Sequence, residues 1–270
     1  MHLAGLVKHS VFLAVLGTAS LLAFSAADAQ SIDEIAKKGR ISIGVLTGAP
    51  PYDSVDKNGN IVGYHVDVAH LIGKELGVEV DIVPVNNSSR VAALESKRID
   101  IQIAQTTPTP QRAKVLMFTS PYGSYQLSII GKKGDVITKP EEMAGKSVSV
   151  PKGSIQDMTL SGMNIPNLTI VRFDDDATAM QALVSSKVDM TGSLAVMAMD
   201  FLKREGLSEK FEVKFPLQTR YFSIAVRKDA FELHQWLNTF LFCINISGEL
   251  DDLHRKWTGV PIPGGRLPSF

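Results

Sequence analysis

Apolar residues follow two alternating patterns along the first half of the chain. Short apolar or alternating runs predict strands at 40–46, 78–85, 99–104 and 125–131. Apolar positions at helical spacing predict helices at 66–76 and 91–96, and Gly77 directly follows the first of these, where a helix commonly ends. Such alternation is typical of parallel sheets covered by helices.

The same alternation begins again after residue 131. It predicts strands at 147–150, 169–173 and 188–190, with helices at 155–161 and 177–186 between them. A late strand at 221–227 precedes helices between 231 and 257. Two such units indicate two α/β lobes joined by a hinge. A single doubly wound sheet would produce a similar pattern, so the alternation alone leaves both architectures open.

Residues 1–29 have the features of a signal peptide. Lys8 and His9 precede an apolar run at 11–24, and Ala27-Asp28-Ala29 supplies the small residues of a cleavage site. The run is shorter than the roughly 20 apolar residues of a membrane-spanning helix. We therefore expect an exported, soluble protein in the periplasm whose mature chain begins near Gln30.

Cysteine and charge content narrow the function classes. Cys243 is the single cysteine, which excludes an internal disulfide, a lipid anchor at the cleavage site and a thiolate-rich metal site. It lies in the apolar helical segment 236–246, where we expect a small buried side chain. The formal net charge is zero, so no long-range field favours nucleic acid or an anionic membrane as a partner. We expect no cofactor and no metal.

Several short motifs occur in a characteristic order. They are Pro50-Pro51-Tyr52, NGNIVGY at 58–64, VDVA at 66–69, Ile99-Asp100, TPQRA at 109–113, FTSPY at 118–122, VPKG at 150–153, AVRK at 225–228 and Lys256-Trp257. Each motif is a weak signal alone, but their order and spacing over residues 40–258 are specific. With them the chain resembles the periplasmic amino-acid-binding proteins of ABC importers, bacterial extracellular solute-binding family 3.

This resemblance implies an α/β fold of the periplasmic-binding-protein type II, with two lobes, a hinge and a ligand cleft between them. Lobe 1 would comprise residues 31–125 plus 220–270, and lobe 2 would comprise 126–219. The implied function is the capture of a small carboxylate-bearing ligand, most naturally a polar or acidic amino acid, by a monomer that delivers it to an ABC permease in the inner membrane. The family usually has an acidic residue where His65 stands, and we expect this change to affect only a surface helix.

The first lobe supplies the strongest ligand-binding candidates. Thr106–Thr109, with Pro108 and Pro110, predicts a loop at the carboxyl end of a strand, where open α/β sheets bind ligands. Arg112 opens the following helix, and its planar guanidinium suits a carboxylate. The resemblance implies that Arg112 binds the α-carboxylate. It also implies that Thr107 adds a hydroxyl and that the Gln105 carbonyl accepts from the ligand amine. A solvated arginine and ordinary loop polarity are the alternatives.

In the second lobe the candidates lie between a predicted strand and a helix. Gly153 and the N–H groups after it can form an anion-accepting turn. Ser154 is expected to cap the helix and, with Gln156, to face the ligand, whereas capping alone is the alternative. Ile155 stands where the family often has a threonine that helps to hold the carboxylate, so one contact is lost.

Two positions bear on ligand charge. Family members that bind acidic amino acids resemble this chain in having Arg90, and a second cation beside Arg112 would favour a dianionic ligand. An exposed arginine at a helix start is the alternative. Leu194 occupies the position of the family's ammonium-binding aspartate. Ser193 or Asp189 would substitute only in a shifted register, and Asp189 is expected to have a structural role.

The family's aromatic positions predict the shape of the ligand. They fall on Ala49 and Asn87, which leaves Tyr52 as the ring expected in the cleft. A small polar or acidic ligand fits this composition better than a bulky aromatic one.

Other functions remain as alternatives. An amine-free carboxylate would explain Leu194, and cyclohexadienyl and arogenate dehydratases share the implied fold. The sequence shows no positioned acid–base pair, no phosphate loop, no nucleophile elbow and no metal-ligand cluster. We therefore expect a binding protein without catalytic residues. A sensor module read by a membrane receptor is the third alternative.

Overall fold

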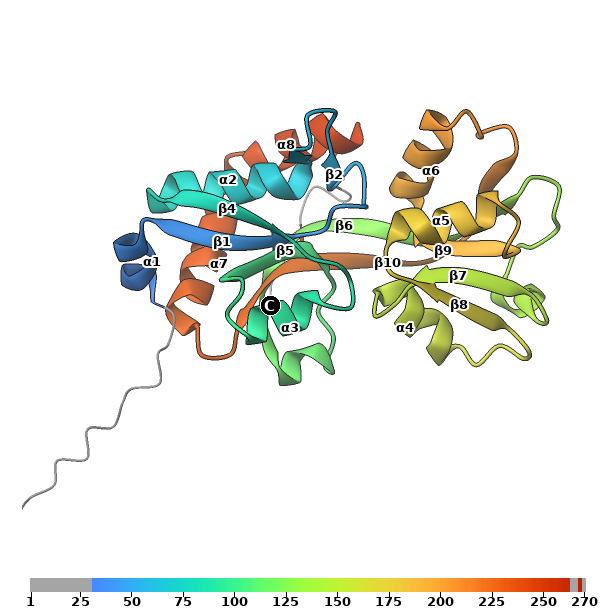
Figure 1. Cartoon of the computed structure of the whole chain (residues 1–270), viewed down its shortest axis with the longest axis horizontal. Coiled ribbons are helices and arrows are strands. Elements are labelled where there is room, and N and C mark those ends of the chain that lie inside the picture. Colours follow the sequence, from blue (N-terminus) through green and yellow to red (C-terminus); the bar gives the residue numbers. More distant parts are fainter. Residues whose placement is uncertain (1–30, 263–266, 269–270) are drawn as a thin grey trace, which may run out of the picture.

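Two long strands form the centre of the structure, which is a computed structural model that describes residues 31–262 and 267–268. They are β6 (Leu116–Lys132) and β10 (Phe211–Arg227), which pair antiparallel along most of their length. Both belong to an eight-stranded sheet in the order β4-β1-β5-β10-β6-β9-β7-β8. In Figure 1 they run from one group of helices and strands into a second group. The predicted signal peptide lies outside the described residues.

The larger group of elements surrounds one end of this ribbon. Strand β1 (Arg40–Val45) pairs in parallel with β4 (Glu79–Pro84) and β5 (Ile101–Thr106), and β5 pairs antiparallel with β10. One large apolar cluster fills this lobe. The remaining elements are α1 (Ile32–Lys38), β2 (Ser54–Val55), β3 (Ile61–Val62), α2 (Tyr64–Leu76), α3 (Arg90–Glu95), the 3-10 turn η1 (Arg112–Lys114), α7 (Phe231–Ile246) and α8 (Glu249–Thr258).

The smaller group surrounds the other end of the ribbon. Strand β7 (Ser147–Pro151) pairs in parallel with β8 (Thr169–Phe173) and β9 (Met190–Leu194). Ile129 and Ile130 belong to two separate apolar clusters, which lie on opposite faces because successive strand residues point to opposite sides. The other elements are η2 (Pro140–Met143), α4 (Ile155–Gly162), α5 (Asp176–Val184) and α6 (Ala195–Arg204).

The two-lobe interpretation of the sequence is confirmed, and the single doubly wound sheet is not observed (Figure 1). The strands predicted at 125–131 and 221–227 are parts of β6 and β10, both of which are much longer. The sequence patterns did not predict a strand at residues 211–220 or helix α6. The predicted lobe boundaries after residue 125 and before residue 220 fall within the two long strands, and they stay a prediction.

His65 is not a surface residue, so the expectation that its substitution changes only a surface helix is wrong. It lies fully buried in the first turn of α2, and its Nδ1 is 2.6 Å from Oδ2 of the equally buried Asp53. The imidazole stacks on Tyr52 and meets Phe222 edge-on. Burial raises the pKa of the Asp53 carboxyl, and His65 acts in the opposite direction.

Gly63 explains why the start of α2 is covered. The chain at Tyr52 crosses directly over it, and a Cβ at position 63 would lie 2.0 Å from the Tyr52 carbonyl oxygen. Its φ of 150° is also one that other residues rarely adopt. The glycine therefore lets the 52–53 segment bury His65 and Asp53 against each other.

Cys243 is exposed, which contradicts the expected buried position. Helix α7 packs Leu237, Leu241 and Ile244 against the lobe, whereas Phe242 and Cys243 face outward. The helix is apolar on both sides, so its sequence does not show which side is buried. No helix in the described ranges combines the length and apolar character needed to cross a bilayer.

We predict that His65→Ala lowers the free energy of unfolding by about 3 kcal/mol, because it leaves the buried Asp53 carboxyl without its partner. Urea denaturation would measure this change. His70→Ala, an exposed position on the same helix, is the matched control and is expected to change stability by less than about 0.5 kcal/mol. Equal stability of the two variants would contradict the importance of the pair.

Candidate functional site

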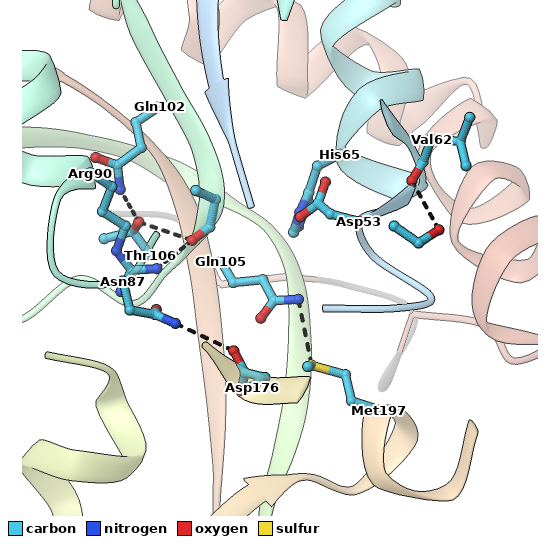
Figure 2. Close-up of polar contacts among 12 residues, drawn as sticks. Asp53, Val62, His65, Asn87, Arg90, Gln102, Gln105, Thr106, Asp176 and Met197 are labelled. Atoms are coloured by element: carbon cyan, nitrogen blue, oxygen red, sulfur yellow. Dashed lines mark hydrogen bonds and ion pairs between the residues drawn. The ribbon is translucent and has the colours of Figure 1, made fainter. Parts of the chain in front are cut away.

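Polar side chains join the two lobes across the region between them. Among the residues that the structure describes, three side-chain hydrogen bonds cross this boundary, and Figure 2 shows two of them. They run from Arg112 Nη2 to the Gly153 carbonyl (3.0 Å), from Asn87 Nδ2 to Asp176 Oδ2 (3.3 Å) and from Gln105 Nε2 to Met197 Sδ (3.8 Å). The lobes are therefore in contact in this structure, and the cleft is closed.

Apolar side chains of lobe 2 complete this contact. Ile155, Leu194 and Met197 belong to the same buried cluster as the core of lobe 1. Leu194 is only 2% exposed, at the end of β9 where α6 begins. Leu194 therefore packs among apolar side chains at the boundary between the lobes, and its place as the family's ammonium-binding position stays a prediction.

Arg112 lies at this boundary with its side chain 9% exposed. It begins a single 3-10 turn and not the α-helix that we expected, and its backbone N–H donates to Thr109 Oγ1. Nη1 donates to the Thr107 carbonyl (2.9 Å), and Nη2 reaches Gly153 in the opposite lobe. A guanidinium has five N–H donors, so these two carbonyl contacts position the fork and leave donors for a carboxylate.

Thr107 lies beside Arg112, and its hydroxyl is hydrogen-bonded to the Tyr125 hydroxyl. Both residues are buried. Burial raises the pKa of Tyr125, with the Thr107 hydroxyl and the charge of Arg112 acting in the opposite direction. The phenol is therefore neutral at physiological pH and can donate to or accept from its neighbour.

Gln105 has an unusual backbone conformation. Its φ of 51° is in the left-handed region, which costs about 1 kcal/mol or more for a residue other than glycine. It is the penultimate residue of β5 and is buried. The same backbone conformation occurs at Lys97, Asn164, Asn167 and Ser186, so it does not by itself mark a functional residue, and the role of the Gln105 carbonyl stays a prediction.

Arg90 is 2% exposed, so its interpretation as an exposed arginine at a helix start is wrong. Its Nη1 donates to the Ala104 carbonyl, and its buried Nε has no hydrogen-bond partner within the described part of the chain. Burial, together with the like charge of Arg112, lowers the pKa of Arg90 to about 9. The side chain thus remains a cation at neutral pH, and it lies within the protein near Arg112.

Ser154 caps α4 as expected, since its Oγ accepts from the Asp157 N–H at 3.2 Å. The adjoining turn is already engaged, because the Gly153 N–H donates to Oδ2 of Asp157. Asp157 is itself paired with Arg172 at 2.9 Å. The Gly153 N–H therefore serves a carboxylate of the protein, which differs from the expected free anion-accepting turn.

Tyr52 and Ser193 are placed differently from the other candidates. Tyr52 is 1% exposed, and its ring packs within the aromatic cluster around His65 and Phe222. It is thus a core residue of lobe 1, and its contact with a ligand stays a prediction. Ser193 is buried on β9. Asp189 accepts from the backbone and hydroxyl of Ser147, both at 2.7 Å, which is a structural role.

Asp176 is the residue of this region that sequence reasoning missed. It is the first residue of α5 and is partly buried. Asn87 donates to one carboxylate oxygen and Gln156 donates to the other. Burial raises the pKa of Asp176 to about 7, whereas Arg90 and the amide of Asn87 act in the opposite direction.

Two cavities have Asp176 in their lining. One, of about 290 Å³, lies between the 46–48 and 84–89 segments of lobe 1 and residues 174–176. The other, of about 230 Å³, is lined by Pro50 of lobe 1 and by Ser193 and Met197 of lobe 2, among others. Thr47, Gly48 and Asp176 line both. In the described part of the chain, no cluster of three or more histidine, cysteine or acidic side chains has the arrangement of a metal site.

Comparison with known proteins agrees with this architecture. Residues 41–260 match the model of the bacterial extracellular solute-binding proteins, family 3. The chain belongs to this family. The resemblance seen in the sequence motifs and the type II fold class are thereby confirmed.

Individual relatives cover nearly the whole chain. The L-cystine-binding protein TcyJ of Escherichia coli K12 is 28% identical over 97% of this chain and 99% of its own length. The P235GK mutant of ArgBP from T. maritima has a TM-score of 0.79 at 31% identity, over 85% of this chain and 100% of that one. An ancestral amino acid-binding protein, AncCDT-1, described as a precursor of cyclohexadienyl dehydratase, has a TM-score of 0.77 at 30% identity, over 84% and 99% of the two chains.

We predict that Thr107→Val and Tyr125→Phe each lower stability by about 1–2 kcal/mol, because each leaves a buried hydroxyl without its partner. The double variant is expected to be more stable than the sum of the two effects implies. Thermal unfolding of the four proteins would measure the coupling. Strict additivity would show that the two hydroxyls do not depend on each other.

Proposed function

We propose that this protein captures an amino acid between its lobes in the periplasm and presents the closed form to the permease of an ABC importer. The carrying observation is Arg112, a buried guanidinium held at the boundary by one carbonyl of each lobe. A ligand carboxylate on this fork would lie where the two lobes meet, and any binding energy that depends on both lobes would favour closure.

The surroundings of Arg112 support a carboxylate. Arg90 adds a second buried cation nearby, and the like charges raise each other's energy in the absence of an anion. Thr107 supplies a hydroxyl and the strained Gln105 supplies a backbone carbonyl at the end of the same strand. The relatives named above are binding proteins for cystine, arginine or amino acids, which supports the same ligand class here.

An amine-free carboxylate is the second candidate, and one observation favours it. Leu194 is buried among apolar residues, and its side chain offers no acceptor for an ammonium group. A ligand without an amine would need none at this position.

Catalysis is not part of the proposal, although AncCDT-1 connects the fold to a dehydratase. Near Arg112, the buried Tyr125 hydroxyl is bound to Thr107, and its pKa is raised by burial. A phenol so stabilised in its neutral form is a weak proton donor at pH 7. We expect purified protein to turn over neither prephenate nor arogenate.

We predict that Arg112→Ala weakens amino-acid binding by at least about 2 kcal/mol, or roughly 30-fold, because it removes a charge-assisted contact from a closed cleft. Isothermal titration calorimetry would measure the loss. Arg112→Lys keeps the charge but loses the planar fork, so its affinity should be intermediate.

Arg98→Ala is the control, since Arg98 is an exposed lobe 1 arginine whose Nη2 contacts the Pro84 carbonyl. Its affinity should equal that of the unaltered protein. If Arg112→Ala bound as tightly as the control, Arg112 would not be the carboxylate site.

The ligand class is tested by thermal shift on protein that has been unfolded and refolded to remove carried-over ligand. A ligand at 1,000 times its Kd adds about 4 kcal/mol, a rise of several degrees in Tm. The panel contains the twenty amino acids, cystine, and di- and tricarboxylates. A response to amine-free acids alone would replace the first candidate by the second.

A further inference from the structure

The closed cleft contains an acidic side chain whose surroundings are unusual. Asp176 begins α5 in lobe 2, while its partner Asn87 precedes α3 in lobe 1 (Figure 2). Both cavities between the lobes have Asp176 in their lining. The carboxylate is therefore placed where a ligand held between the lobes can reach it.

Neighbouring carboxylates do not have the same freedom. Asp175 caps α5, because its Oδ1 accepts from the N–H and the hydroxyl of Thr178. Asp157 is paired with Arg172 and Asp53 with His65. Asp176 receives only one amide on each oxygen, from Asn87 and Gln156. A carboxylate offers about four acceptor positions, so two amide donors leave room for a cation.

The charge balance of the site also points to a cation. Arg90 acts electrostatically on Asp176 and favours its ionised form, so the acidic ligand that Arg90 alone would favour meets an acidic side chain in the same region. A dianionic ligand would be repelled by Asp176, whereas a ligand with one carboxylate and one cationic nitrogen would match Arg112 and Asp176 together.

From these observations we infer that Asp176 is the acceptor for an ammonium or other cationic nitrogen of the ligand, in place of the aspartate that is absent at Leu194. Asn87 and Gln156 are positioning residues that orient the carboxylate from opposite lobes. This inference rests on the proposed function and narrows it to amine-bearing ligands. The cationic nitrogen belongs either to the α-amine or to the ligand side chain.

The titration of Asp176 gives the site a measurable signature. Burial raises its pKa to about 7, so the carboxyl is partly protonated in the empty closed form at neutral pH. A bound cation stabilises the carboxylate and lowers this pKa, so binding at pH 7 releases up to about half a proton. Affinity for an amine-bearing ligand should then fall as the pH drops below 7. The groups that face Asp176 are Arg90, Asn87, Gln156 and Asp175, with Asp174 and Arg204 lining the cavities.

The experiment compares Asp176→Asn with the unaltered protein on matched ligand pairs. The pairs are L-cystine with 3,3′-dithiodipropionate, L-arginine with 5-guanidinopentanoate, and L-glutamate with glutarate, each differing by the α-amine. L-Arginine with L-citrulline tests a side-chain cation in the same way. Asparagine has nearly the same shape as aspartate but no charge. Asp176→Asn should therefore lower the affinity at least about tenfold for a bound ligand that carries the additional amine or cationic nitrogen of its pair. Affinity for the partner without that nitrogen should change by less than about twofold.

Asp174→Asn is the control, because it removes the same charge two residues away from an exposed position. Asp174→Asn should bind like the unaltered protein. An equal loss of affinity in both variants would show that the effect comes from the overall negative charge of this region and not from a direct contact of Asp176. Calorimetry of the unaltered protein in two buffers of different ionisation enthalpy supplies a test that needs no variant. It should show proton release only with ligands that carry the cationic nitrogen bound by Asp176.

The outcomes separate the two levels of the proposal. Binding of amine-bearing ligands with unchanged preference in Asp176→Asn, and no proton release, would overturn the role of Asp176 and leave the proposed function standing. Binding of amine-free acids alone would overturn both. If Asp176→Asn weakened the binding of L-arginine but not of L-citrulline, Asp176 would bind a side-chain cation. If it weakened the binding of the amine-bearing member in each α-amine pair, Asp176 would bind the α-ammonium.

Discussion

The antiparallel pairing of β6 with β10 is the constraint on which the rest of the structure depends. Each strand has 17 residues and passes from one lobe to the other, so a single hydrogen-bonded ribbon holds both halves of the sheet. Two small apolar clusters lie in lobe 2, and the large cluster of lobe 1 also includes Ile155, Leu194 and Met197 of lobe 2. The ribbon also keeps the ends of β5 and β9 facing each other, and the candidate site lies there.

That boundary combines apolar with charged contacts. Leu194 and Ile155 of lobe 2 join the large apolar cluster of lobe 1, and this burial favours closure independently of ligand charge. The remaining polar groups then divide between Arg112 with Arg90 on one lobe and Asp176 on the other. A zwitterion placed between them would satisfy charges that are costly to bury alone.

The sequence predicted the parts of this arrangement that depend on local patterns. Strand and helix periodicity located most elements, and the Thr/Pro loop before Arg112 marked one side of the site. The first half of β10 was missed because Pro216 and scattered charges interrupt its alternation. His65 and Asp176 were missed because their environments are set by Asp53 and Asn87, and pairings between distant segments leave no periodic signal. Burial of Arg90 similarly depends on the carbonyl of Ala104 on a different element.

The path of the chain through the ribbon also determines the order in which the lobes can be completed. Lobe 2 is formed by one continuous stretch between β6 and β10, whereas the sheet of lobe 1 requires β5 to pair with the end of β10, far along the chain. Closing such a long loop costs conformational entropy, and pairing between segments so far apart in the sequence is slow. The topology therefore allows the smaller lobe to form before the larger one, whose sheet keeps an open edge at β5 until β10 pairs with it.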